Sequence, residues 1–121
     1  MAGQTESGKE RVRFLLDRLE DAWERSKWHS FQGALERLTA EEAAWRPEHY
    51  RSPQPWSFSG SILEILVHVA LDILVMTNRA FGAQTLTAEA VWERFRAEGG
   101  DLAAALDLLE EGYQATREAL M

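Results

Sequence analysis

The chain has 121 residues, a net charge of −7 and no cysteine. This length suits a single domain that buries roughly two-thirds of the surface that its unfolded form exposes. The negative charge argues against nucleic acid and anionic membranes as partners, because both require a positive protein surface. The lack of cysteine excludes disulfides, thiolate zinc sites and cysteine nucleophiles, so a metal would need His, Asp or Glu ligands.

No targeting or membrane segment is predicted. Residues 1–10 are polar and contain no apolar signal core. The longest apolar run, between Ile62 and Met76, is interrupted by polar residues and is shorter than the ~18 residues that span a bilayer. We therefore expect a cytoplasmic protein.

The N-terminal third is predicted to be helical. We expect residues 1–8 to form a flexible tail and residues 9–121 to form one helical-bundle domain. A helical face starts after Lys9, and a second apolar set continues with helical spacing after Ser30. The pattern leaves open whether the helix kinks at residues 26–30 or runs through. The first face consists of Val12, Leu15, Leu16, Leu19, Ala22 and Trp23.

A capping box and a proline-rich connection follow. In Thr39-Ala-Glu-Glu42 the threonine hydroxyl can accept a free amide proton while Glu42 reaches back, which predicts the start of a short helix. That helix must end before Pro47. Residues 46–56 carry all three prolines and are predicted to be an extended crossing.

The central helix is predicted to run from an N-cap at Ser57 to a stop at Gly82, which makes it ~24 residues and ~36 Å long. Its core is apolar except at Glu64, His68 and Asp72. These three residues follow at i, i+4 and i+8 and form one narrow polar stripe. A helix that is apolar almost all round is normally buried.

Two more helices complete an all-α fold. Thr87 caps a shorter helix, the pair Gly99-Gly100 breaks it, and Asp101 caps the last helix. The last helix has a seam with bundle-like spacing that still runs at its end, and the central helix is left with one poorly covered side. We therefore expect a second copy of the chain to cover it, as a homodimer. The seam consists of Leu102, Leu106, Leu109, Tyr113, Thr116 and Leu120.

Several motifs occur together over roughly residues 10–120: Trp28-His29, Trp45-Arg46-Pro47, Trp56-Ser57, the helical His68 and Phe81-Gly82. This combination resembles the DinB/YfiT-like superfamily of bacterial helical bundles. The resemblance implies an up-down bundle with three long helices and short connecting helices. The position of the fourth helix is then missing or supplied by a second subunit.

The resemblance also implies a divalent metal, often nickel or zinc, held by three histidines. His68 matches one of them, whereas the other two form a His-x-x-x-His on the last helix of the family. Residues 101–121 contain no histidine, so the matching part of the pattern would lie beyond residue 121 and one copy cannot build the standard site. Some relatives are thiol-dependent S-transferases or hydrolases.

Three hypotheses follow. The first is a DinB-like homodimer of unassigned activity with an incomplete metal site. The second is a divalent-metal-dependent enzyme that uses His68 and His29 with Glu64 or Asp72, shared between subunits; otherwise these residues form a solvated edge. The third is a bundle that binds a small molecule in a tryptophan-lined pocket, although tryptophans more often anchor cores. His49 is predicted to face solvent.

Overall fold

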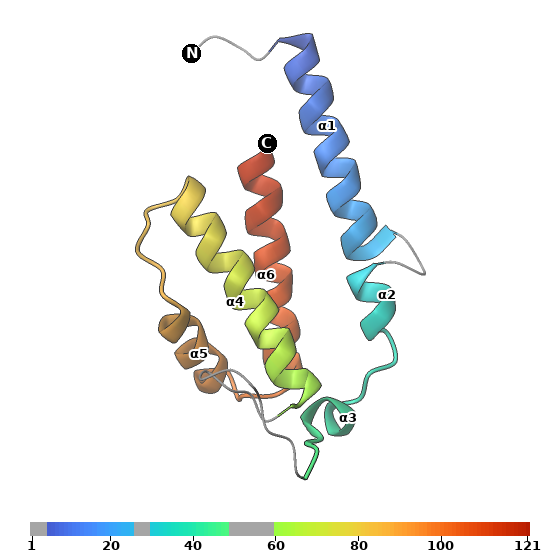
Figure 1. The fold of residues 1–121 in the computed structure, drawn as a ribbon, viewed down its shortest axis with the longest axis vertical. Coiled ribbons are helices and arrows are strands. Elements are labelled where there is room, and N and C mark those ends of the chain that lie inside the picture. Colours follow the sequence, from blue (N-terminus) through green and yellow to red (C-terminus); the bar gives the residue numbers. More distant parts are fainter. Residues whose placement is uncertain (1–4, 26–29, 49–59) are drawn as a thin grey trace. The chain divides into compact units, whose positions relative to one another are not determined.

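The computed structural model describes residues 5–25, 30–48 and 60–121, and every regular element within these ranges is a helix (Figure 1). The prediction of an all-α chain is confirmed. Among the described residues none of the helices is long and apolar enough to cross a membrane. The elements are α1 (Glu6–Glu20), the π-helical turn η1 (Asp21–Arg25), α2 (Phe31–Leu35), α3 (Ala40–Ala44), α4 (Ile62–Phe81), α5 (Ala88–Ala97) and α6 (Leu102–Leu120).

The chain divides into two compact units. The first comprises Met1–Arg37 together with Arg117–Met121, and the second comprises Leu38–Thr116. The expectation of one domain over residues 9–121 and of an up-down bundle stays a prediction.

In the first unit, α1 begins earlier than the sequence pattern indicates. Thr5 is its N-cap and accepts a hydrogen bond from the amide of Gly8 at 3.0 Å, so residues 6–8 belong to the helix rather than to a tail. The helix does not run through to the second apolar set. It passes into η1, and a new N-cap at Ser30 starts α2. The rings of Trp23 and Phe31 stack at 5.9 Å, which joins η1 to α2.

The apolar face predicted for the first helix is buried only at its end. α1 has no fully buried residue, whereas Trp23 in η1 is buried. Leu15 is 48% exposed and Phe14, which is not part of the predicted face, is 62% exposed. The amphipathic pattern therefore predicted the helix correctly but overstated its burial.

In the second unit, the capping box and the end of the short helix are confirmed. Thr39 Oγ1 accepts from the amide of Glu42 at 3.1 Å, and the Glu42 carboxylate accepts from the amide of Thr39 at 3.1 Å. α3 ends at Ala44, before Pro47. Most of the proline-rich crossing lies outside the described residues.

The predicted start of the central helix is wrong. Gly60 has a φ of +88°, a left-handed conformation that an α-helix cannot contain, so the helix starts after it. Ser61 is the N-cap and accepts from the amide of Glu64 at 3.2 Å. The helix has 20 residues and ends at Gly82 as predicted, which makes it ~30 Å long. Ser57 lies outside the described residues.

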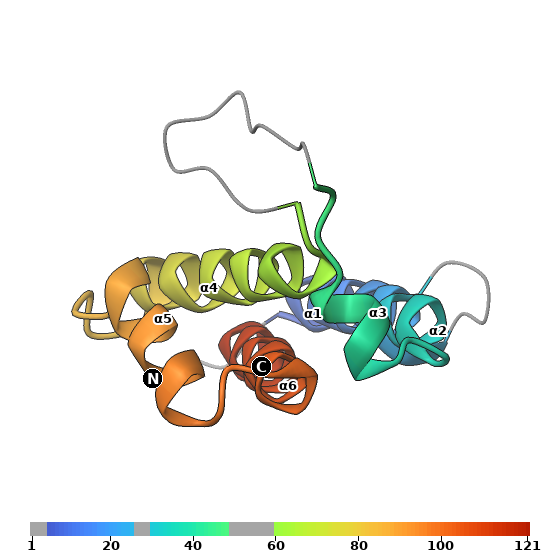
Figure 2. The ribbon, with the colours of Figure 1, turned by 90° about the horizontal axis from the view of Figure 1, so that it is seen from below.

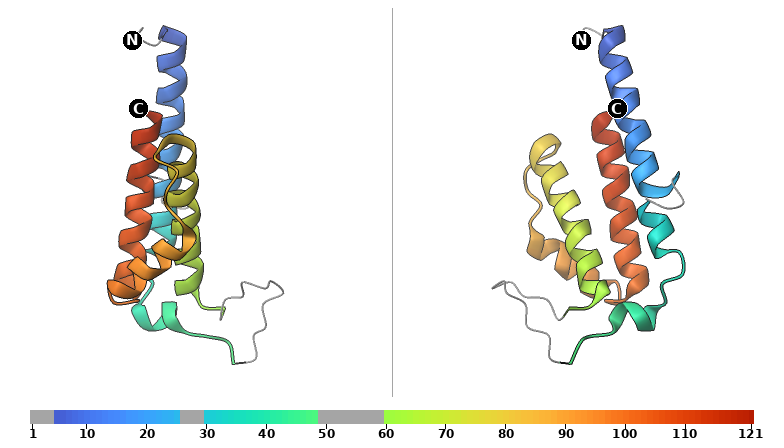
Figure 3. Two further views of the ribbon diagram at one scale, coloured as in Figure 1. Left: turned by 90° about the vertical axis from the view of Figure 1, so that its left-hand side faces the viewer. Right: turned by 45° about the vertical axis from the view of Figure 1, so that its right-hand side comes forward.

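The core of the second unit lies on one side of α4. Figure 2 shows α5 and α6 on the same side of α4, and α4 and α6 run side by side in the views of Figures 1 and 3. A Cβ added to Gly112 of α6 would lie 3.1 Å from Cγ2 of Ile73, so the two helices approach closely there. The buried side chains are Leu66, Val67, Ala70, Leu71 and Leu74 of α4, Val91 and Phe95 of α5, and Ala104, Ala105, Leu108, Leu109 and Tyr113 of α6.

The seam predicted for the last helix is buried at its centre, where Leu109 and Tyr113 belong to the core, but Leu106 is 37% exposed. Ala105, Leu108 and Gly112, which the predicted seam leaves out, are also buried. An α-helix has 3.6 residues per turn, so a strict 3-4 seam drifts away from a straight contact. The small residues allow the helix backbones to approach, and the contact is therefore centred on them. The caps at Thr87 and Asp101 and the break at Gly99-Gly100 are confirmed.

Candidate functional site

The polar stripe of α4, defined by Glu64, His68 and Asp72, lies along an edge of the helix that is partly exposed. Nε2 of His68 lies 3.2 Å from Oδ2 of Asp72, one turn further along. The side chain of His68 is 38% exposed and that of Asp72 is 60% exposed. The imidazole is therefore neither in the core nor fully in solvent, and the neighbouring carboxylate orients it.

Glu64 has a different partner. Its carboxylate lies 3.4 Å from the guanidinium of Arg46, which follows α3, and its side chain is 20% exposed. Glu64 and Asp72 are ~12 Å apart along the helix axis, because eight residues separate them. The stripe thus divides into a salt bridge from Glu64 to Arg46 and an imidazole–carboxylate contact within α4, rather than forming one centre.

The described residues do not fit a metal site of three or more ligands. Residues 5–25, 30–48 and 60–121 contain no group of three or more His, Asp or Glu side chains that could hold a metal ion. A closed zinc site needs four ligands and a catalytic one needs three. His29 and His49 lie outside the described residues, so His68 and Asp72 are the two predicted ligands that the structure brings together.

A second feature of α4 is an exposed apolar seam. The sequence predicts a poorly covered side of this helix but does not identify its residues. We define the α4 seam as Ile62, Ile65, Val69, Asp72, Met76 and Arg79, which follow each other at alternating steps of three and four residues. Ile62 is 42%, Ile65 50% and Met76 60% exposed. At about 100° per residue, the seam points away from the buried Val67 and Leu74. The 3-4 spacing was visible in the sequence, but the sequence does not show which side of α4 packs into the core.

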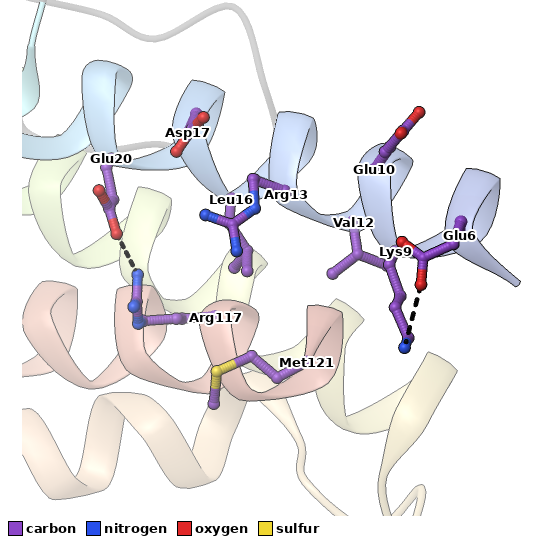
Figure 4. A pocket seen from close by; sticks show the side chains of 10 residues that line it. All are labelled: Glu6, Lys9, Glu10, Val12, Arg13, Leu16, Asp17, Glu20, Arg117 and Met121. Carbon is purple, nitrogen blue, oxygen red and sulfur yellow. Dashed lines mark hydrogen bonds and ion pairs between the residues drawn. The ribbon is translucent and has the colours of Figure 1, made fainter. Parts of the chain in front are cut away.

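The first unit contains a surface groove of about 580 Å³ between α1 and the last residues of α6 (Figure 4). Its wall is mixed in charge. Lys9 pairs with Glu6 at 3.5 Å, and Arg117 pairs with Glu20. Leu16 contributes apolar surface. The pairing of basic with acidic side chains leaves no single charge sign that would select a ligand class.

The described tryptophans lie in separate elements. Trp23 is buried in η1, Trp45 at the end of α3 is 67% exposed, and Trp92 of α5 packs edge-to-face on Phe95 at 5.9 Å. None of the three lines the groove of the first unit. Trp28 and Trp56 lie outside the described residues. The described tryptophans therefore act as packing anchors and surface residues of separate elements.

Two carboxyl groups with shifted pKa values lie outside α4. The hydrogen bond from Arg25 at 2.6 Å lowers the pKa of Asp21 in η1. The hydrogen bonds from the backbone amide and then the hydroxyl of Thr39 lower the pKa of Glu42. Both shifts favour the ionised form of a helix-capping or surface carboxylate, which is a structural role.

The comparisons with known proteins add no assignment to this geometry. No family model, no curated protein and no solved structure matches the chain.

Proposed function

We propose that the chain is a short helical bundle of the DinB/YfiT-like type, of unassigned activity, that works in the cytoplasm as a homodimer. The exposed apolar seam of α4 carries this proposal, with Ile65 and Met76 at least half exposed. Contiguous apolar surface that a monomer leaves in water marks an interaction surface. The motifs around Trp45 and His68 support the family assignment, and the net charge of −7 disfavours nucleic acid as the partner.

The magnitude indicates a reversible dimer. Complete burial of an Ile or Met side chain contributes roughly 1.5–3 kcal/mol. Ile62, Ile65 and Met76 are each about half exposed, so in two copies they contribute on the order of 5–9 kcal/mol. Association costs an estimated 4–15 kcal/mol of lost freedom. The difference is at most about 5 kcal/mol in favour of association, which corresponds to a dissociation constant of roughly 0.1–1 mM, so we expect a weak, reversible dimer rather than an obligate one.

The second candidate is a divalent-metal-dependent enzyme of thiol S-transferase or hydrolase type. The observation that favours it is the 3.2 Å contact between His68 and Asp72, because a carboxylate that contacts an imidazole can orient it as a metal ligand. This site would need at least one further ligand from outside the described residues, such as His29. Elemental analysis of untagged protein tests it: bound nickel or zinc that is lost in His68→Ala is expected, and protein without stoichiometric metal contradicts it.

Light scattering across a concentration series, coupled to size-exclusion chromatography, tests the homodimer. The wild type should pass from monomer to dimer in the range from about 0.1 to 1 mM. Ile65→Glu places a charge in the seam and should weaken the dimer more than about tenfold, which corresponds to 1.4 kcal/mol. Leu106→Glu is the matched control, because it makes the same change at an exposed position of α6 and should leave the dimer intact. A wild type that stays monomeric at all concentrations overturns the proposal.

A further inference from the structure

One polar residue interrupts the apolar part of the α4 seam, and its position is informative. Asp72 occupies a seam position between Val69 and Met76, and its side chain is 60% exposed. A polar residue in such a seam lowers stability but specifies how two helices align. The partner of Asp72 across the interface therefore decides the arrangement of the dimer.

The seam is self-complementary when the two helices run in opposite directions. Ile65 and Met76 are equally distant from the midpoint between Val69 and Asp72. A two-fold axis at that midpoint consequently places Ile65 of each copy opposite Met76 of the other. Both copies use the same patch, as a closed two-fold dimer requires.

We propose that α4 pairs antiparallel with α4 of a second copy about this axis, so that His68 of each copy lies beside Asp72 of the other. This inference rests on the homodimer proposed above and adds its geometry. The His68–Asp72 contact at 3.2 Å within one chain shows that the two side chains already lie on the same edge of the helix. In the dimer each carboxylate gains a second imidazole as a hydrogen-bonding partner near the centre of the interface.

Electrostatics disfavours the parallel arrangement. Two parallel helices in register would place the two Asp72 carboxylates at the same level of the seam, where like charges repel. The antiparallel arrangement offsets them by about 4.5 Å along the axis and places an imidazole next to each. The helix dipoles also oppose each other in the antiparallel pair, which is favourable.

Disulfide trapping tests the arrangement, and the absence of native cysteine makes single-cysteine variants unambiguous. Ile65→Cys and Met76→Cys are oxidised separately and as a mixture. The antiparallel dimer should give the mixed disulfide, exceeding either homotypic disulfide by roughly tenfold, because bridged Cα atoms must lie within about 7 Å. A parallel dimer instead links each variant to itself.

Light scattering on the same variants separates the two proposals. A dimer that gives no mixed disulfide, or that gives homotypic disulfides, overturns the antiparallel arrangement while the homodimer stands. A monomer overturns both. As a further readout, Asp72→Leu should tighten the dimer by about tenfold or more, since it completes the apolar seam. Combined with Ile65→Cys or Met76→Cys, it should allow homotypic disulfides to appear. An Asp72→Leu variant that dimerises more weakly than wild type contradicts the placement of Asp72 at the interface.

Discussion

α4 and α6 are helices of nearly equal length, with 20 and 19 residues, that use their apolar side chains differently. α6 buries one face, centred on small residues such as Ala105 and Gly112. α4 buries one face and leaves a second one, the α4 seam, in solvent. An apolar helix can therefore complete the core of its own unit with one face and leave apolar side chains of another face exposed.

The largest expected effect on stability distinguishes the buried face of α6 from the exposed α4 seam. Leu108 of α6 is fully buried, and Leu108→Ala should lower the free energy of unfolding by about 2–5 kcal/mol, because it removes apolar contacts and leaves a cavity. Ile65→Ala on the α4 seam should cost less than about 1 kcal/mol in the monomer, since half of its side chain is already in water. Urea denaturation at a concentration below the dimer range measures both.

The two variants also differ in the dimer. Ile65→Ala should weaken association measured by light scattering, whereas Leu108→Ala should leave the affinity of the folded fraction unchanged. Equal losses of stability in the two variants would show that Ile65 is as buried as Leu108, which contradicts an exposed α4 seam.

A smaller effect should come from the close approach of α4 and α6 at Gly112. In Gly112→Ala, the new Cβ would lie 3.1 Å from Cγ2 of Ile73, so the neighbouring side chain or helix must shift. Overpacking costs about 1–3 kcal/mol, while alanine gains about 1 kcal/mol over glycine in helix propensity. We expect a net loss of up to about 2 kcal/mol in urea denaturation.

Gly33→Ala in α2 is a control for helix propensity, since Gly33 is a helical residue whose amide donates to Oγ of Ser30. It should be neutral or stabilising. A Gly112→Ala variant as stable as Gly33→Ala would indicate that α4 and α6 can separate at no cost.

Local chemistry explains which parts of the fold the sequence predicts. The caps at Thr39, Thr87 and Asp101 depend on a side chain and an amide three residues away, and all three were predicted. The start of α4 was predicted wrongly, because Ser57 and Ser61 are both good N-caps. The left-handed conformation of Gly60 makes Ser61 the N-cap, and the spacing of apolar residues in the sequence does not predict that conformation.

The candidate site depends on contacts that are distant in sequence and was less predictable. The spacing of the polar stripe was visible in the sequence, but the partners of its residues were not. Glu64 forms a salt bridge with Arg46, which follows α3, while His68 contacts Asp72. The proposed role of His29 lies outside the described residues and stays a prediction. Which residues of α4 are exposed could be identified only from the structure, because it depends on the side of α4 against which α5 and α6 pack.

The smallest effect concerns α3, which packs against α4 and carries the capping box. Hydrogen bonds from the Thr39 amide and hydroxyl lower the pKa of Glu42 in the folded state. The cap therefore stabilises α3 fully above the unfolded-state pKa of a glutamate, about 4.3, and loses this contribution as the pH falls through the lower folded-state value. The Thr39 amide resonance in a proton–nitrogen NMR titration should shift on acidification, with a midpoint below about 4.3.

The neutral variant Glu42→Gln should abolish the titration of the Thr39 amide, because the group that ionises is gone while the side chain can still accept a hydrogen bond. Glu41→Gln, an exposed neighbour in the same helix that is not part of the box, should leave the titration unchanged. The resonances of Leu108 and Leu109 should not move in this pH range in any of the three proteins, since the core of the second unit contains no carboxylate. A midpoint above the ordinary glutamate value, or a titration that survives Glu42→Gln, would mean that the cap is not what orders the start of α3. In that case the packing of α3 against α4 orders the start of α3 instead. The core contacts of α4 would then include α3 as well as α5 and α6.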